Sequence, residues 1–174
     1  KYLLVFVVMV TGIFYALPNL YGEDPALQIS ALRGGTEIGD TVQGSVEASL
    51  NVRKILQRFR EVGWPVVYVR HNFEPGGDIH ENVEPLEGEK VIPKNQVNSF
   101  KDTDLLDHLH KHQIQKLVIC GMMTHMCVEA AARAGHDYGF ECSVIQDACA
   151  TKALQFSGKE VSAENVHYAT LAKL

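Results

Sequence analysis

The chain of 174 residues is 46% hydrophobic and 21% charged, and its net charge is −5 at pH 7. This length suits one core, so we expect residues 1–174 to form a single domain. The hydrophobic fraction excludes a wholly disordered chain, and the acidic balance offers no basic footprint to nucleic acids or anionic membranes. Four cysteines without C-x-x-C spacing favour reduced thiols and a cytoplasmic location.

An uninterrupted apolar run begins the sequence at Tyr2–Val10 and continues, mostly apolar, to Leu17. A signal peptide would also combine a lone basic residue, here Lys1, with a short apolar core. A membrane span needs about 20 apolar residues, and Thr11 and Pro18 cut this run short. We therefore predict a strand buried on both faces, which reads as a continuous apolar run.

After a turn-rich region at Pro18–Gly44, apolar strands alternate with amphipathic helices. Ser45 is expected to cap the first helix, and Asp102 or Thr103 the second. Strand–helix alternation predicts an α/β fold, a three-layer α/β/α arrangement with a mainly parallel central sheet. The predicted elements are the helices Ser45–Val62, Asp104–His112, His125–Tyr138 and Ser162–Leu174, the strands Pro65–Arg70, Lys116–Cys120 and Glu141–Gln146, and a short extended piece at Lys90–Ile92.

Ligands bind at the carboxyl ends of the strands in such sheets, and a cysteine stands at one of these ends. Cys127 follows the Gly121 turn, close to the start of a predicted helix. Exposed N–H groups and the positive helix end favour a thiolate there and can hold an oxyanion. The alternative is a small buried side chain on the inward helix face. Cys120 and Cys142 lie within apolar strands, where we expect inert packing.

Three polar residues could assist such a thiol, and each also has a structural interpretation. Lys94 follows a short apolar piece and could stabilise a thiolate, although a loop lysine is usually solvated. His71 ends the second strand and could act as an acid, a base or a substrate contact. Asp147 ends a later strand, where it could simply cap a turn.

Histidines suggest metal ligands at two places, but neither pattern is strong. His108 and His112 are one helical turn apart, and histidines in a last turn interact favourably with the helix dipole without a metal. Asp78 and His80 with His71 could form a three-ligand set, but they lie in a loop. We therefore expect neither a metal nor a cofactor.

Three segments resemble the isochorismatase-like cysteine hydrolases, relatives of nicotinamidase and N-carbamoylsarcosine amidase. The most specific ones are Gly121–Glu129 (GMMTHMCVE) and Asp147–Thr151 (DACAT). Upstream, Val91–Lys94 (VIPK) with Asn98–Phe100 (NSF) matches the family's lysine segment in identity and order. The resemblance extends from about Gly44 to the last residue.

This resemblance implies an isochorismatase-like fold and roles for particular residues. Cys127 would be the nucleophile, and Lys94 would favour its thiolate. The backbone N–H groups of Met123 and Cys127 would form an oxyanion hole, and a non-prolyl cis peptide would join Met122 to Met123. Four side chains are expected to contact the substrate, namely those of His71, Phe100, Met122 and Thr124.

The sequence departs from the family at the first strand. Family members carry an Asp-x-Gln pattern there, with the aspartate as general base. Here the aspartate position falls on Val7 or Val8, and the glutamine position on Met9 or Val10. The family's metal-binding relatives place an aspartate two residues before the strand-end histidine, where this chain has Val69, which argues against a metal.

Together these features predict a cysteine hydrolase that cleaves a small amide-like or related substrate through an acyl-enzyme on Cys127. Without the aspartate, His71 is the first candidate for moving the proton. The alternative is a catalytically impaired relative that binds a small molecule or a protein. A redox-sensing cysteine with Cys149 as its partner is a third interpretation. The resemblance also implies a homo-oligomer, and we expect no nucleic-acid or membrane partner.

Overall fold

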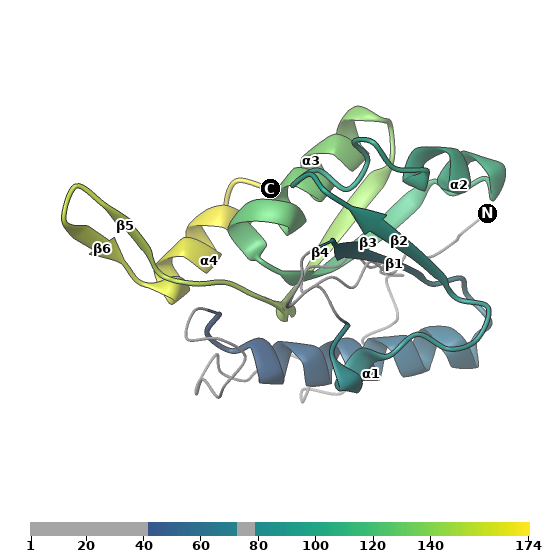
Figure 1. The fold of residues 1–174 in the computed structure, drawn as a ribbon, viewed down its shortest axis with the longest axis horizontal. Helices are drawn as coiled ribbons and strands as arrows, with labels where there is room; N and C mark the ends of the chain where they lie inside the picture. The colour runs from purple at the N-terminus through teal and green to yellow at the C-terminus, as the bar shows by residue number, and fades with distance from the viewer. Residues whose placement is uncertain (1–41, 73–78) are drawn as a thin grey trace.

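The computed structural model describes residues 42–72 and 79–174 of the chain. Parallel strands form the middle layer there, and helices cover them on both sides (Figure 1). Helix α1 (Ser45–Glu61) lies on one side of the strands. On the other side lie α2 (Leu105–Lys111), α3 (Glu129–Asp137) and α4 (Ala163–Leu171). The predicted α/β/α architecture with parallel strands is confirmed.

Two pairs of parallel strands carry this middle layer. Strand β1 (Val67–His71) pairs with β2 (Lys90–Lys94), in a register that ends with His71 opposite Lys94. Strand β3 (Lys116–Met122) pairs with β4 (Glu141–Ala150), with an irregularity between Ile119 and Gly121. The extended piece predicted at Lys90–Ile92 is thus a full strand, and it brings Lys94 into the sheet. The predicted strand Tyr2–Val10 lies outside the described residues.

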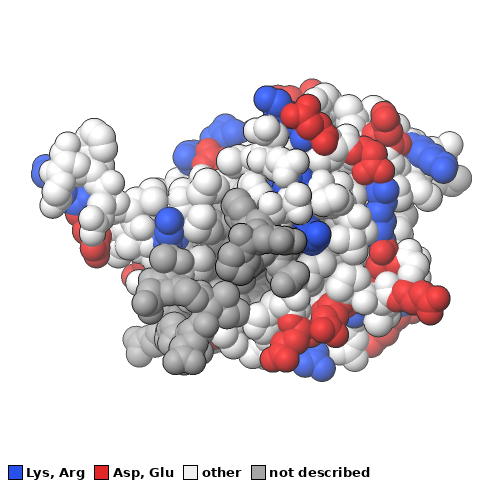
Figure 2. All heavy atoms as spheres, viewed as in Figure 1, with Lys and Arg blue, Asp and Glu red and all other residues white. Residues whose placement is uncertain are grey.

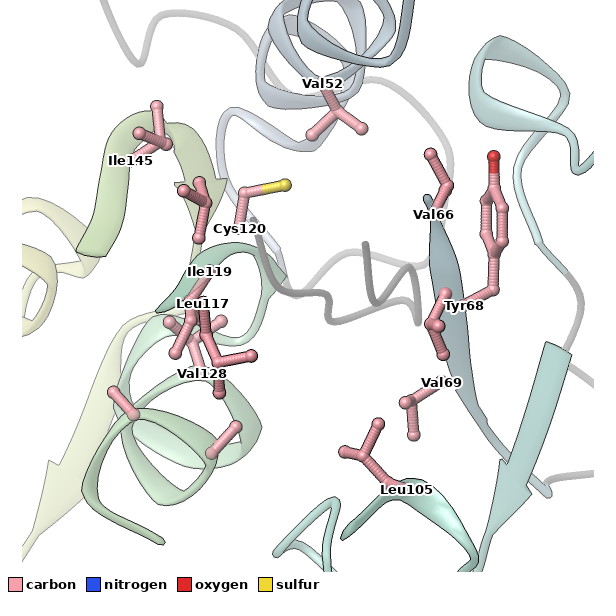
Figure 3. Packing of buried hydrophobic residues seen from close by; sticks show 14 of the residues in the cluster. Val52, Val66, Tyr68, Val69, Leu105, Leu117, Ile119, Cys120, Val128 and Ile145 are labelled. Atoms are coloured by element: carbon pink, nitrogen blue, oxygen red, sulfur yellow. The ribbon is translucent and has the colours of Figure 1, made fainter. Parts of the chain in front are cut away.

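The core fills the space between these strands and the helices (Figure 3). Helix α1 contributes a stripe of side chains at helical spacing, which becomes completely buried against the strands. Figure 3 shows Val52 of this stripe pointing toward the strands, with Cys120 of β3 beneath it. The buried stripe consists of Ala48, Val52, Leu56 and Phe59.

Two predicted helix caps were wrong. Helix α1 is preceded by Gly44 with φ 74°, a left-handed conformation that glycine adopts easily, and Ser45 is already helical. Asp104, not Asp102 or Thr103, is the residue before α2. The Thr103 hydroxyl still accepts a hydrogen bond from the Leu105 N–H at 3.3 Å.

The single helix predicted over His125–Tyr138 is divided. A π-helical turn, η3 (Thr124–Val128), precedes α3, and Gly139 follows with φ 88°. Strand β4 continues beyond Gln146 to Ala150, so Asp147 lies within a strand and does not cap a turn. A short 3-10 turn, η2 (Glu81–Val83), was not predicted.

An antiparallel hairpin between β4 and α4 was missed as well. It consists of β5 (Leu154–Phe156) and β6 (Lys159–Val161), and Figure 1 shows it projecting from the body. Ser157 and Gly158 form its two-residue loop with φ 50° and 74°, the positive values that tight hairpin turns require. Strands of three residues are too short for their alternation to be recognised in sequence.

No helix in the described segments is long and apolar enough to cross a membrane. Figure 2 shows basic and acidic side chains side by side around the rim of one face, not a continuous basic patch.

Candidate active site around Cys127

The carboxyl ends of the strands gather the predicted site residues. Lys94 ends β2 and His71 ends β1, and the register places these two residues opposite each other. Met122 ends β3 opposite Ala150 of β4, and the turn that carries Cys127 follows directly. These segments, in which the sequence predicts catalytic or binding residues, therefore meet at one edge of the sheet, as expected for parallel strands.

The turn η3 presents Cys127 on a backbone of unusual shape. A non-prolyl cis peptide joins Met122 to Met123, as the resemblance implied. The N–H groups of Met126 and Val128 both point to the Met123 carbonyl, at 3.0 and 3.4 Å. Among the described residues, no carbonyl outside the turn accepts the Cys127 N–H. The resemblance assigns this N–H to the oxyanion hole.

Lys94 and Cys127 are both buried and lie in contact. The lysine is 1% exposed and the cysteine 7% exposed. The lysine Nζ donates a hydrogen bond to the Val97 carbonyl at 2.5 Å. Burial lowers the pKa of Lys94, whereas the charge and hydrogen bond of the Cys127 sulfur raise it. In the described part of the chain, no carboxylate acts on this ammonium group.

His71 is a half-buried neighbour of Lys94. Burial, and then the charge of Lys94, lower the pKa of this imidazole, while a hydrogen bond with the Asn95 backbone raises it. Because opposed residues of parallel strands point to the same face, His71 lies on the same side of the sheet as the ammonium group. An imidazole with a lowered pKa is neutral at pH 7 and can accept a proton.

The other predicted substrate contacts differ in their placement. Met122 is half-buried at the end of β3, beside the turn. Thr124 is fully buried, and its hydroxyl already shares a hydrogen bond with His167. Phe100 is not brought to the site. Its ring lies 5.2 Å from that of Tyr138 and 6.2 Å from that of Phe140, as part of the core.

Two hydrogen bonds around the turn were not predicted. Thr124 Oγ1 lies 2.9 Å from His167 Nδ1, and His125 Nδ1 lies 2.5 Å from Thr151 Oγ1. His167 belongs to α4 and is 2% exposed, and burial lowers its pKa. Nothing in its spacing distinguishes this histidine from an ordinary residue of an amphipathic helix. Thr151 belongs to the family motif Asp147–Thr151, but the resemblance assigned it no role.

The other three cysteines are unreactive thiols. Burial raises the pKa of both Cys142 and Cys149 to about 12, and that of Cys120 well above its usual value. All four cysteines are free. Cys149 lies close enough to Cys120 to influence its titration, and no such influence links it to Cys127. These contacts do not favour Cys149 as a redox partner of Cys127.

The histidine patterns do not form a metal centre among the described residues, where no cluster of three potential ligands occurs. The rings of His108 and His112 lie 4.5 Å apart, and burial together with its neighbour lowers the pKa of His108 to about 4. His80 accepts a hydrogen bond from the Asn82 N–H and so caps η2. Asp78 lies outside the described residues.

Asp147 faces away from this chemistry. Its backbone carbonyl accepts a hydrogen bond from the Asn51 amide of α1 at 2.8 Å. Burial raises the pKa of its carboxyl group, and the charge of Lys54, also from α1, lowers it. The side chain is therefore associated with the α1 side of the sheet.

Comparisons with known proteins agree with this geometry. The chain is 45% identical over 139 residues to the uncharacterized isochorismatase family protein YddQ of Bacillus subtilis, which covers 74% of this chain and 77% of that protein. An isochorismatase structure from Pseudomonas putida has a TM-score of 0.77 at 28% identity, covering 98% of this chain and 81% of that one. A streptothricin hydrolase of Streptomyces noursei is 34% identical over 108 residues, covering 57% of this chain and 43% of that protein.

One match is of a different kind. A stretch of 57 residues is 47% identical to the protein translocase subunit SecD of Escherichia coli, covering 33% of this chain and 8% of that protein. The chain is therefore similar, over a third of its length, to a protein outside the group formed by its other relatives.

The family itself is established by a match over most of the chain. The sequence model of the isochorismatase domain matches residues 28–169, which include both strand pairs and the Cys127 turn. The parallel α/β architecture is shared with the solved structures of that group. The chain belongs to the isochorismatase family, and it is a hydrolase of that family.

Proposed function

We propose that the protein is a thiol hydrolase that cleaves a small amide-like substrate through a covalent acyl-enzyme on Cys127. The observation that supports this most strongly is the buried contact between the Lys94 ammonium group and the Cys127 sulfur. Lys94 ends β2, and Cys127 lies on the turn η3 that follows the carboxyl end of β3. Substrates of such folds bind at these carboxyl ends.

The charge balance of this pair favours a thiolate. A buried ammonium group is costly unless an opposite charge compensates it. The Val97 carbonyl supplies a hydrogen bond but no charge, and no carboxylate in the described segments acts on Lys94. The thiol proton can leave Cys127 and produce that opposite charge in direct contact with the ammonium.

The reaction follows from this arrangement. The thiolate attacks the substrate carbonyl, forming a C–S bond and an oxyanion held by the N–H groups of Met123 and Cys127. Collapse of this intermediate breaks the C–N bond, and the amine leaves with the proton that the Cys127 thiol gave up. Water then attacks the thioester and loses a proton, the C–S bond breaks, and that proton returns to the sulfur, so the acid and the free thiol are released.

His71 is the group we propose for moving the protons in these steps. It lies beside Lys94 and is neutral at pH 7 because burial and the ammonium charge lower its pKa. This imidazole would take the thiol proton and give it to the leaving amine, and would then take a proton from the attacking water and return it to the departing sulfur. Removing a general acid–base group lowers turnover by a factor of about 10²–10⁴.

The proposed substrate is small because the sulfur is recessed. Cys127 is 7% exposed, so an extended polymer has little access to it, whereas the carbonyl of a small molecule can reach it. The name of the Streptomyces relative, streptothricin hydrolase, supports a hydrolytic reaction on a small molecule.

Turnover on a panel of small primary amides and ureido compounds tests this proposal, with released ammonia as the readout. We expect Cys127→Ser to lower turnover by a factor of about 10³ or more. Cys142→Ser is the matched control, because this half-buried cysteine lies away from the site. A Cys127→Ser variant with full turnover would contradict the mechanism.

A second candidate is a binding module that has lost catalysis. It is supported by the lack of a carboxylate near Lys94 among the described residues, and it agrees with the expectation that the aspartate position falls on Val7 or Val8. It predicts no amide turnover and a Cys127 thiol that reacts with alkylating reagents like a free cysteine.

A further inference from the structure

The turn that carries Cys127 is held from outside by two pairs of threonine and histidine. At the start of the turn, the N–H groups of Met126 and Val128 share the Met123 carbonyl. π-Helical turns of this kind occur frequently at functional sites. Two side chains of the turn, those of Thr124 and His125, are in addition hydrogen-bonded to side chains of other elements.

The first of these hydrogen bonds joins the turn to α4, far along the chain. Thr124 is the first residue of the turn, and its hydroxyl shares a hydrogen bond of 2.9 Å with His167 Nδ1. Thr124 is 0% exposed and His167 is 2% exposed. A buried hydrogen bond with no competing water has a defined geometry, and losing either partner leaves a buried polar group unsatisfied.

The second hydrogen bond joins the turn to Thr151, the residue after the end of β4. His125 Nδ1 lies 2.5 Å from the hydroxyl of Thr151, and the Thr151 carbonyl accepts a hydrogen bond from the Gln43 N–H at 2.9 Å. This pair is more exposed, because His125 is half-buried. The fully buried pair of Thr124 and His167 is the one that fixes where the turn begins, directly after Met123.

We propose that His167 is a positioning residue, which acts through Thr124 to direct the N–H groups of Met123 and Cys127 at the substrate carbonyl oxygen. This inference rests on the proposed thiol hydrolysis and adds a contribution from α4 to it. The Thr124 hydroxyl touches no substrate in this account. Its hydrogen bond keeps the oxyanion hole in register with the thiol.

Two reactions of the same sulfur separate this role from a general effect on the fold. Alkylation by iodoacetamide forms a C–S bond and expels iodide, so it needs the thiolate but no oxyanion hole. Acetyl transfer from p-nitrophenyl acetate forms a C–S bond at a carbonyl and expels p-nitrophenolate, so it needs both. A misplaced oxyanion hole slows the second reaction alone.

The test measures both rates in the full chain with Thr124→Val, which removes the hydroxyl and keeps the shape of the side chain. We expect acetyl transfer to fall about tenfold to a hundredfold, within the range for a displaced oxyanion donor, while alkylation is unchanged. Thr124→Ser restores the hydroxyl and should restore the rate. Thr170→Val is the matched control, because this buried hydroxyl bonds only to the Val166 carbonyl within α4.

Three results would overturn the inference: acetyl transfer at the wild-type rate in Thr124→Val, an equal fall in both reactions, or the same selective loss in Thr170→Val. If Thr124→Val does not fold, His167→Asn and His167→Leu give the same comparison, since the asparagine amide can replace Nδ1 and leucine cannot. A wild-type protein that is alkylated but never acetylated at Cys127 would instead contradict the proposed function.

Discussion

Replacing Lys94 by methionine removes the ammonium group and keeps a long apolar side chain in its place. At about 4 Å and an effective dielectric constant near 20, the attraction between an ammonium and a thiolate is about 4 kcal/mol. This energy corresponds to a factor of about 10³ in an equilibrium constant. Water that enters the altered site recovers part of it, so we expect the rate of Cys127 alkylation at pH 7 to fall about a hundredfold.

The rate of Cys127 alkylation by iodoacetamide at pH 7, followed by peptide mass spectrometry, measures this fall. Lys90→Met is the matched control. Lys90 begins the same strand, β2, but is paired with Asp104 at 2.6 Å on the surface. Cys142 and Cys149 provide an internal baseline, since burial raises the pKa of each to about 12.

The same substitution should not destabilise the fold. Removing one partner of a buried ion pair is costly when the other charge remains unpaired. Here the thiolate can take up a proton and become a neutral thiol, so no charge is left without a partner. An unchanged alkylation rate in Lys94→Met would show that the lysine does not stabilise a thiolate on Cys127.

Three further predictions concern stability. The folded protein should lose stability as the pH falls from about 6.5 toward 4, because burial lowers the pKa of several histidines and unfolding then takes up protons. Urea titrations should show this loss, and it should be smaller in His108→Gln, since the pKa of His108 is lowered to about 4. Gly135→Ala should cost about 1–3 kcal/mol, because the new Cβ would lie 2.8 Å from the sulfur of Cys142, and Cys142→Ala should recover most of the loss. Glu89→Gln should cost about 1–2 kcal/mol through a half-buried guanidinium pair at 2.8 Å, whereas Glu61→Gln, at an exposed pair, should change the unfolding free energy little. The histidines whose pKa is lowered by burial, and which produce the loss of stability at low pH, are His71, His108, His125 and His167.

The fold was predictable because its signals are periodic. The stripe of α1 and the continuous apolar character of β3 follow directly from burial on one face or on both. Strand β2 was predicted only in part, since its five residues include Lys94 and Pro93, which are untypical of a buried strand. Parallel pairing with β1 is a tertiary effect that local propensity does not contain.

The candidate site was predictable where one residue carries the chemistry. Cys127 and Lys94 could be assigned from a family motif, and the structure places them in contact. The sequence could not show whether Phe100 contacts the substrate or packs in the core, because its ring neighbour Tyr138 is distant in the sequence. The role of His167 depends on one hydrogen bond across 43 positions, and no short-range pattern records such a bond.

Capture of the covalent intermediate shows whether Cys127 is acylated during turnover. The full chain is mixed with p-nitrophenyl acetate, quenched in acid within the first turnover, digested and analysed by mass spectrometry. We expect one acetyl group per chain, on the peptide that contains Cys127, and none in Cys127→Ala. Acetylation that is equally abundant in Cys127→Ala, or that lies on another residue, would contradict this expectation.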